Sequence, residues 1–583
     1  MFLNYIYALG GSRVALANIP TRTILLVNAP KKNPQAAIYA HAQWDLAEAC
    51  SRHKKLSMSI YQENNNLVSL TTRQFLQRLV RAAKRIIVLT LLALPAVVGA
   101  PLSYGLRTII PKVEDMMWSY LLWAIEKSGP TFIKLAQWAS TREDLFPAAL
   151  TNRLVKLQDN TRPHGWKHTS KLLKAALGDW EKFLHIEEQR PIGSGCIAQV
   201  YKGTLKSPQK IMPAPGSGEE EEELKAGDEN KEEKGLKKVE AGTHVAVKVL
   251  HPNIRDNVEA DMDIMKSFAS FIELFPKLKY LSFRDTILEF EKVLIDQMDL
   301  SHEGTNLCRL TENFEDDQDI FFPQPIQNMV SENVLVETFI HGIPVLNFIN
   351  AEEKVKKELC DLGADAIYRM CFLHNFLHGD LHPGNILVID REQTTTTAAG
   401  RMVDWAKEHL GRSKRRYALA FLDAGMVVEL SYQDHLNMVK VLGAFIMRQG
   451  HRAGELMADF SKSRDTTDLE GFCAGIQDIV QRSVDEEFFS EMGQYTSDIF
   501  ALACRHHVKL ESKFIATSLA VKVMEGIVIH LNPDIDMVSK GIPPLLKSQI
   551  KYGLYKEVLQ LKEIYKDLLG SAEKELANNV PQS

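Results

Sequence analysis

The stretch Phe376–Asp390, FLHGDLHPGNILVID, predicts the fold of this 583-residue chain. Asp380 stands five residues before Asn385, and an apolar run that has the composition of a strand follows. This spacing is typical of the kinase catalytic loop H-R-D-L-x-x-x-N, in which the Asp receives or orients the attacking hydroxyl and the Asn holds Mg²⁺. Gly379 occupies the position of the usual Arg, which predicts that phosphorylation of an activation loop does not control the site.

A glycine-rich stretch upstream fits the same fold. In PIGSGCIAQVYKG, residues 191–203, the spacing G-x-G-x-x-G-x-V is present with alanine at the third glycine. Such a turn lets backbone N–H groups face phosphates. A dinucleotide-binding fold would need a helix next, but VYKGTL has the pattern of a strand. The predicted phosphate-binding residues are Gly193, Ser194, Gly195, Cys196, Ile197, Ala198 and Val200.

Two further motifs complete the predicted ATP and Mg²⁺ site. VAVKVL places Lys248 where a kinase lysine reaches the α- and β-phosphates, and such a lysine needs a carboxylate partner on a helix. Glu303 is the favoured partner, with Glu259 and Asp263 as weaker alternatives. The long gap from Lys248 to Glu303 predicts an inserted helical segment. FLDAG places Asp423 as the main Mg²⁺ ligand, beside Asn385.

The order of these motifs predicts an α+β, two-lobed protein-kinase-like fold with a small strand-rich N-lobe, a helical C-lobe and a helical N-terminal extension. An acidic segment, 207–242, interrupts the N-lobe and has the composition of a disordered insertion. The predicted parts are the extension 112–180, the N-lobe 181–340, the C-lobe 341–535 and a helical tail 536–583.

Composition excludes several other classes of protein. Hydrophobic residues make up 45% of the chain, the formal net charge is −5, and no basic block of the kind that binds nucleic acid is present. The seven cysteines are scattered without a C-x-x-C pair, so neither a zinc site nor a disulfide framework is indicated.

Two N-terminal segments predict a location. Residues 1–44 contain no Asp or Glu but several basic residues, which is typical of a mitochondrial transit peptide, although a disordered terminus could lack acids by chance. Residues 86–106 are uncharged, and a helix of this length matches a hydrocarbon core of about 30 Å. They predict a single transmembrane helix, and the alternative is a hairpin buried against the soluble domain.

Together, KSGPTFIKLAQWASTREDLFP (127–147), GSGCIAQVYKG, QMDLSHEGTNL and FLHGDLHPGNILV resemble the UbiB family of aarF-domain-containing atypical kinases. The resemblance covers about residues 112–535. The family's K-x-G-Q motif corresponds to Lys134 and Gln137, with Ala136 replacing glycine, and its E-x-D motif ends at Asp299, with Gln297 replacing glutamate.

The resemblance implies that the Lys134 helix lies over the active site and blocks protein substrates. It also implies ATP binding, weak ATPase or lipid-linked phosphotransfer, and a role in coenzyme Q biosynthesis and mitochondrial lipid metabolism. Membrane lipids, quinone precursors and coenzyme Q biosynthesis proteins would be the partners, at the mitochondrial inner membrane. Two alternatives stay open, an ATP-switched scaffold for lipid or protein partners and a true Ser/Thr protein kinase. Gly379 and the lack of an A-P-E motif near Asp423 disfavour the protein kinase.

Overall fold

The computed structural model divides the chain into two units, Met1–Arg81 and Ala82–Ser583, and the second contains all the predicted motifs. The transit-like segment 1–44, the acidic residues 215–237 and Asp380 lie outside the described residues. Those described are 72–106, 112–140, 150, 153–154, 163–214, 238–272, 283–379, 381–391, 415–460, 468–485, 498–499, 501–503, 505–506, 508 and 537–554.

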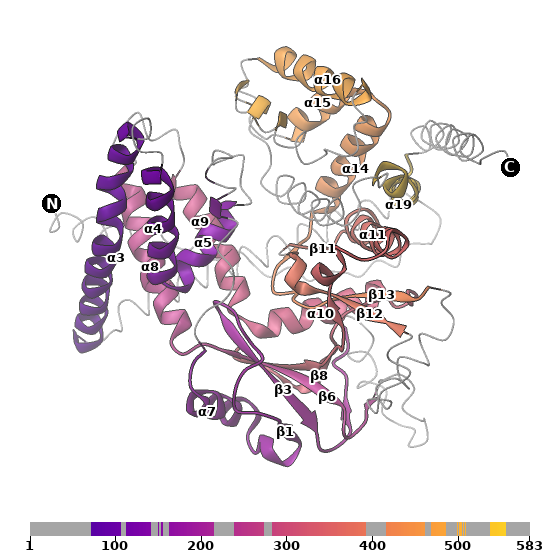
Figure 1. The fold of residues 1–583 in the computed structure, drawn as a ribbon. Helices are drawn as coiled ribbons and strands as arrows, with labels where there is room; N and C mark the ends of the chain where they lie inside the picture. The colour runs from indigo at the N-terminus through magenta and orange to yellow at the C-terminus, as the bar shows by residue number, and fades with distance from the viewer. Residues whose placement is uncertain are drawn as a thin grey trace, which may run out of the picture. The chain divides into compact units, whose positions relative to one another are not determined.

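The N-lobe is built on an antiparallel sheet with the strand order β1-β3-β6-β9-β8. Buried and partly exposed residues alternate along β3, as the pleat of a strand requires. The buried face of the sheet packs with Leu173 of α7 around Tyr201 and Val247, so α7 covers this face (Figure 1). The strands are β1 (Leu184–Ile186), β2 (Gly193–Ser194), β3 (Ala198–Leu205), β6 (His244–Leu250), β8 (Pro325–Val330) and β9 (Val334–Thr338), and α7 is Trp166–Leu177.

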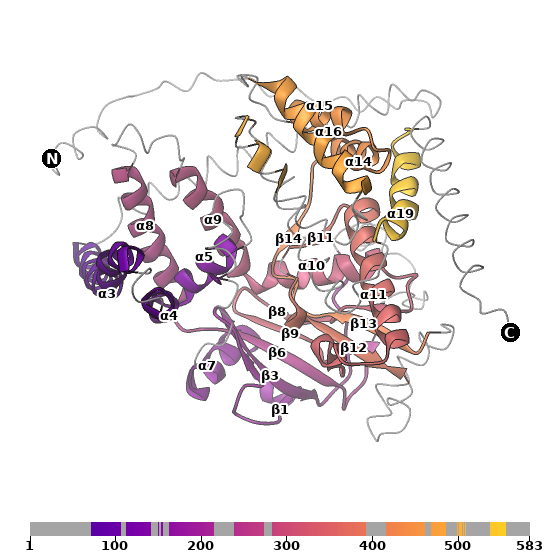
Figure 2. The same ribbon diagram turned by 45° about the horizontal axis from the view of Figure 1, so that its top comes forward.

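Helix α10 (Leu300–Asn313) contacts β8 and β9 from the other side of the sheet. Between β6 and α10 the chain forms α8 (Ile254–Ile272) and α9 (Phe283–Gln297), which pack against each other. These two helices confirm the predicted helical segment between Lys248 and Glu303. Two helices of the N-terminal extension, α4 (Lys112–Ser128) and α5 (Pro130–Ser140), lie beside them, and α5 contacts both α8 and α9 (Figure 2).

The C-lobe begins with α11 (Glu353–Tyr368), which continues into a π-helical turn, Arg369–His374. A four-stranded sheet in the order β10-β12-β13-β7 packs next to it, and β11 pairs with β14. Helices α14, α15, α16 and α19 complete the lobe, whose large core includes Phe372, Phe421 and Phe472. The strands are β7 (Ile320–Phe321), β10 (Ile343–Pro344), β11 (Leu377–His378), β12 (Ile386–Asp390), β13 (Tyr417–Phe421) and β14 (Val427–Val428). The helices are α14 (Tyr432–Ile446), α15 (Gly450–Phe460), α16 (Leu469–Asp485) and α19 (Met537–Lys551).

This arrangement confirms the two-lobed kinase-like fold with a helical N-terminal extension. The acidic segment 207–242 begins and ends in a small hairpin of β4 (Gln209–Lys210) and β5 (Lys238–Val239). Ala198 begins β3 and Lys248 lies near the end of β6, whereas Asn385 precedes β12 and Asp423 follows β13.

The predicted transmembrane helix over 86–106 requires correction. These residues form the second part of one continuous helix, α3 (Thr72–Leu106), and not a hairpin. Among the described residues, no helix combines the length and apolar character that a membrane span needs. Residues such as Gly99, Pro101 and Gly105 interrupt the aliphatic run toward its end. The helix also contacts α4, where the Tyr120 hydroxyl donates to the Leu92 carbonyl at 3.0 Å. The single-pass anchor is therefore unsupported.

Candidate functional site

The glycine-rich loop is a tight turn between β2 and β3. The Gly195 N–H donates to the Ala198 carbonyl at 2.9 Å, which closes the turn. Cys196 within it is almost fully buried. The strand register places Val200 directly opposite Lys248 of β6, so the turn and the lysine belong to the same end of the sheet.

Lys248 forms a buried ion pair with Glu303 of α10, as predicted from the sequence. A second carboxylate, Glu337 of β9, lies 3.4 Å from the Lys248 Nζ. The side chain of Lys248 is 12% exposed, and those of Glu303 and Glu337 are 6% and 3% exposed. The weaker alternatives to Glu303, namely Glu259 and Asp263, lie on α8, and Asp263 pairs there with Lys266 instead.

The start of α10 fixes where Glu303 stands. Asp299, the last residue of the altered E-x-D motif, is the N-cap, and its Oδ1 accepts from the Ser301 N–H at 2.9 Å and the Ser301 hydroxyl at 2.6 Å. Such caps satisfy the unpaired N–H groups of a first helical turn. Asp299 therefore orients the helix that carries Glu303.

Asn385 and Asp423 lie at the same end of the β12–β13 pair. Ile386 pairs with Phe421, and the Leu422 N–H donates to the Asn385 carbonyl at 2.9 Å. The Gly425 N–H donates to Asp423 Oδ1 at 2.9 Å. These backbone bonds hold one carboxylate and one amide next to each other, which are ligands that suit Mg²⁺ when phosphates and water supply the rest. Within the described part of the chain, no group of three or more His, Cys, Asp or Glu side chains is placed to bind a metal ion.

Helix α10 also contacts the Asp423 segment. Asn306, one turn after Glu303, donates from Nδ2 to the Ala424 carbonyl at 2.9 Å. Ala424 itself is fully buried, in the position where the D-F-G motif of protein kinases has phenylalanine. One helix therefore touches both the lysine pair and the predicted Mg²⁺ segment.

The charges around Lys248 shift the pKa values of the acids unequally. Burial would raise the pKa of Asp423, but Lys248, the Gly425 N–H, His378 and Lys134 together lower it to about 2. Burial raises the pKa of Glu303 above its ordinary value despite the neighbouring Lys248. Burial opposes the charge of Lys248, yet the three carboxylates raise its pKa, so the lysine stays protonated. The site thus holds a cation and an ionised Asp423 at neutral pH.

Helix α5, which carries the K-x-x-Q residues, approaches the same site. Its Lys134 lies close enough to Asp423 to help lower the pKa of that carboxyl. Phe132, Leu135 and Trp138 pack against the main core, and the Trp138 and Phe290 rings are 5.6 Å apart. Gln137 lies one turn after Lys134 on the same helix.

Met426 lies directly against Gly379, which stands where protein kinases have arginine. The Gly379 N–H donates to the Met426 carbonyl at 2.8 Å, and a Cβ at this position would lie 2.9 Å from the end of the Met426 side chain. The segment around the predicted base therefore pairs directly with the strand after Asp423, and β11 aligns with β14.

Glu337 is the site residue that sequence reasoning missed. A glutamate within the apolar strand VLVET was the available signal, because a buried strand rarely carries a charge without a partner. Its register opposite Ala246 turns it to the face of β6 that carries Lys248. One of its oxygens, Oε2, is buried and has no hydrogen-bond partner among the described residues.

Replacing Glu337 with Gln is expected to flatten the pH dependence of stability. Burial raises the pKa of Glu337 from 4.5 to about 7, with Lys248 opposing the shift. A raised carboxyl pKa stabilises the fold at pH below the ordinary value and loses this contribution as pH rises through the shifted value. Between about pH 5 and about pH 8, the free energy of unfolding of the wild type should therefore fall more than that of Glu337→Gln, by on the order of 1–2 kcal/mol. The melting temperature of the wild type should fall more as well.

Thermal unfolding of both proteins across this pH range tests the expectation. Glu429→Gln is the control, because Glu429 forms a surface pair with Arg309 that is 2.6 Å long and largely exposed. The same pH dependence of the melting temperature in the wild type and Glu337→Gln would contradict the assignment of a buried carboxyl with a raised pKa.

Comparison with known proteins agrees with this geometry. Residues 237–457 match the ABC1 atypical kinase-like domain. The chain is 28% identical over 550 residues to the mitochondrial ABC1 family protein C21C3.03 of Schizosaccharomyces pombe, which covers 89% of this chain and 76% of that protein. It is 29% identical over 469 residues to the mitochondrial ABC1 family protein YPL109C of Saccharomyces cerevisiae, covering 74% and 68%.

The chain is also similar to a bacterial protein. The probable protein kinase UbiB of Sodalis glossinidius is 26% identical over 483 residues, which covers 78% of each chain. These matches extend well beyond the kinase-like domain itself. The chain therefore contains an ABC1 atypical kinase-like domain and has mitochondrial ABC1 proteins and UbiB among its homologues, as its sequence motifs predicted.

Proposed function

We propose that this protein is an atypical kinase or ATPase that binds ATP with Mg²⁺. The observation that carries the proposal is the buried Lys248–Glu303 pair at the same end of the sheet as the glycine-rich turn, with Asp423 close enough to interact electrostatically. In kinases the lysine contacts the α- and β-phosphates, and its paired carboxylate keeps it in place. A simple structural ion pair would not need a third carboxylate held ionised beside it.

Each residue has a distinct role in this proposal. The N–H groups of the turn from Gly193 to Ala198, other than the Gly195 N–H that closes the turn, face the phosphates, and Lys248 neutralises part of their charge. Asp423 and Asn385 would hold Mg²⁺, which stabilises the charge that develops on the transferred phosphoryl group. Asp380 is proposed as the base that receives the proton of the attacking hydroxyl. Lys134 and Gln137 on α5 lie toward the nucleotide and cover it.

We further propose a role at a mitochondrial membrane, in coenzyme Q biosynthesis and lipid metabolism, with quinone precursors or lipids as partners. The similarity to mitochondrial ABC1 proteins and to UbiB supports the setting. The exposed aliphatic side chains of α3 support a lipid partner, since water does not favour such a surface. Examples are Ile87, Leu91, Val97 and Val98, which are 59%, 65%, 68% and 64% exposed.

A second candidate is an ATP-switched scaffold that changes shape on binding nucleotide and does not turn it over. The contacts of α10 with both Lys248 and the Asp423 segment favour it, because nucleotide at either place would move the same helix. A Ser/Thr protein kinase is the least favoured, because Gly379 replaces the arginine of the catalytic loop and α5 approaches the site.

The deciding experiment measures MgATP binding and turnover by the full-length chain, with and without liposomes that contain a phenolic quinone precursor. The wild type is compared with Asp380→Asn. An enzyme is expected to keep nucleotide binding in this variant and lose turnover by about 100-fold or more, since a positioned base contributes about 10²–10⁴-fold.

The other outcomes are equally informative. Binding without turnover in both proteins would replace the enzyme with the switched scaffold. Wild-type protein that binds no nucleotide would contradict both readings. Turnover that survives Asp380→Asn unchanged would remove Asp380 from the mechanism.

A further inference from the structure

His251 makes two hydrogen bonds to the glycine-rich turn. It follows directly after β6, three residues beyond Lys248. Its backbone N–H donates to the Ile197 carbonyl at 2.9 Å, and its ring Nε2 lies 2.8 Å from the Gly195 carbonyl. Since a carbonyl only accepts, the Nε2 carries the hydrogen. One histidine therefore ties two positions of the turn to the end of the lysine strand.

This bond sets the direction of a longer chain of hydrogen bonds. In a neutral imidazole with hydrogen on Nε2, the Nδ1 is an acceptor. The Nδ1 of His251 lies 2.8 Å from the Nδ1 of His164, so His164 must donate there. The other ring nitrogen of His164 then accepts, and the Thr169 hydroxyl, 2.9 Å away, donates to it.

The chain continues into the interior of the sheet. The Thr169 oxygen lies 2.8 Å from the Tyr201 hydroxyl, which donates because the Thr169 hydrogen is already used. The Tyr201 oxygen in turn accepts from the Gln199 side-chain amide. Thr169, Gln199 and Tyr201 are fully buried, so water cannot replace a lost bond at this end. Burial of such polar groups is tolerable only while each has its partner.

The side-chain amide of Gln199 bonds to both backbone groups of His164. The Gln199 amide accepts from the His164 backbone N–H at 2.9 Å and donates to its carbonyl at 3.3 Å. His164 precedes α7, which belongs to the segment N-terminal to the N-lobe sheet. The network therefore runs from Gln199 and Tyr201 of β3 through Thr169 of α7 and the two histidines to the Gly195 carbonyl in the turn.

We propose that His251 and His164 are positioning residues of the nucleotide site, and that their relay from Gln199 to Gly195 fixes the glycine-rich turn for phosphate binding. The role in phosphate binding rests on the proposed function, whereas the hold on the turn does not. Neither histidine touches the reacting atoms. Each acts through the Gly195 carbonyl, whose orientation determines where the neighbouring N–H groups of the turn point.

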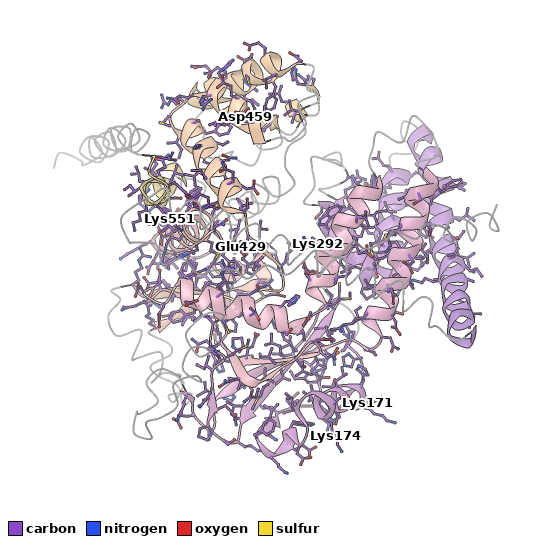
Figure 3. All side chains as sticks on the ribbon, turned by 180° about the vertical axis from the view of Figure 1, so that it is seen from behind. Lys171, Lys174, Lys292, Glu429, Asp459 and Lys551 are labelled. Atoms are coloured by element: carbon purple, nitrogen blue, oxygen red, sulfur yellow. The ribbon has the colours of Figure 1, made fainter. Side chains whose placement is uncertain are left out.

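Burial and neighbouring charges lower the pKa of both histidines, which favours the neutral rings that the relay requires. Burial, followed by the charges of His251 and His168, lowers the pKa of His164 to about 4. Burial also lowers the pKa of His251, opposed by its bond to Gly195. The other facing groups are His168, whose ring stands edge-on to His164 at 4.9 Å, and Lys171, which acts on His168 and projects with Lys174 from α7 (Figure 3). A second proton on His251 would set N–H against N–H at the Nδ1 pair, and a second proton on His164 would set its Nε2–H against the hydroxyl hydrogen of Thr169.

Cys196, buried in the turn, provides a reporter that needs no nucleotide. The experiment measures the rate at which a small thiol reagent labels Cys196 in the full-length protein, with Cys308 as an internal reference. Cys308 is a buried thiol of α10 outside the relay. We expect His251→Phe to accelerate labelling of Cys196 by about two- to tenfold, since one hydrogen bond changes an opening equilibrium by about that factor. Labelling of Cys308 should not change.

Three further variants make the result specific. His168→Phe is the matched control, because His168 belongs to the same ring cluster but its Nε2 has no hydrogen-bond partner among the described residues. It should leave Cys196 as slow as in the wild type. His251→Gln keeps a side-chain N–H and should recover part of the protection. The double variant His164→Phe/His251→Phe should be no faster than the single variant, because either change breaks the same chain.

Unchanged Cys196 labelling in a folded His251→Phe protein would overturn the proposal. An equal acceleration at Cys308, or the same effect from His168→Phe, would also overturn it, since either would indicate general loosening. ATP binding by the same proteins separates the two proposals. If the wild type binds no ATP, the proposed function fails while the labelling still decides the hold on the turn. If it binds, His251→Phe should raise the Kd by about two- to tenfold.

Discussion

Replacing Lys248 with Met is expected to abolish ATP binding and to destabilise the kinase-like domain. The change removes the one cation that pairs with Glu303 and also faces Glu337. Removing one partner of a buried ion pair costs about 3–5 kcal/mol, because the remaining charge stays buried without compensation. At the same time, the phosphates lose the lysine that is predicted to contact the α- and β-phosphates. Thermal unfolding and equilibrium ATP binding measure the two losses separately.

A compensated variant distinguishes the loss of stability from the loss of function. Replacing Glu303 and Glu337 with Leu in the Lys248→Met background removes the buried charges together, which is often close to neutral for stability. This triple variant should regain much of the melting temperature but no ATP binding. Lys266→Met is the matched control, because Lys266 forms a 2.8 Å pair with Glu291 on the α8–α9 helices instead. ATP binding that survives Lys248→Met would remove the lysine from the site.

Replacing Asp423 with Asn is expected to lower Mg²⁺-dependent ATP binding or turnover by about 100-fold or more, because an amide cannot supply the charge that balances the metal ion. The pKa of Asp423 is lowered to about 2, so the carboxylate is ionised throughout the neutral range. A lowered carboxyl pKa contributes stability above the ordinary value near 3.8, and this contribution is lost as pH falls toward about 2. The variant should therefore also lose less stability than the wild type on acidification through that window.

Isothermal titration with ATP in the presence of Mg²⁺ or EDTA measures the first effect. Asp390→Asn is the control, because Asp390 lies at the opposite end of the β12–β13 pair from Asp423 and pairs with Arg416 at 2.9 Å. It should keep Mg²⁺-dependent binding even if it melts earlier. Equal Mg²⁺ dependence in Asp423→Asn and the wild type would contradict the assignment of the metal ligand.

Much of the site could be predicted because kinase motifs are short and their spacing follows from strand and loop geometry. The pair of Lys248 with Glu303 is an example, since the lysine needs a helical carboxylate and QMDLSHEGTNL offers one. Glu337 was missed because its partner comes from another strand, through a register that the sequence does not state. The relay of His251 and His164 was missed for the same reason, since the two histidines are 87 residues apart in sequence.

The transmembrane prediction for 86–106 was wrong for a different physical reason. The aliphatic run is interrupted by Gly99, Pro101 and Gly105, and no helix of the described residues is long and apolar enough to span a membrane. In the structure, Arg85 at the start of this segment bonds to Asp261 of α8 at 2.9 Å through its guanidinium, so the helix is tied to the domain at that end. The aliphatic character was recognised correctly, and side chains such as Ile87, Leu91 and Val97 are exposed, but the residues between them make the helix as a whole too polar for a span.

The two contacts of α10 give the domain a mechanical property. Glu303 holds the lysine strand and Asn306 holds the Ala424 carbonyl, and the two residues are one helical turn apart on the same side of α10. A rotation of this helix about its axis would move both residues and release both contacts together. Helix α9 contacts α10, so a partner that moves α8 and α9 would displace α10. That one displacement would change the contacts of both Lys248 and the Asp423 segment.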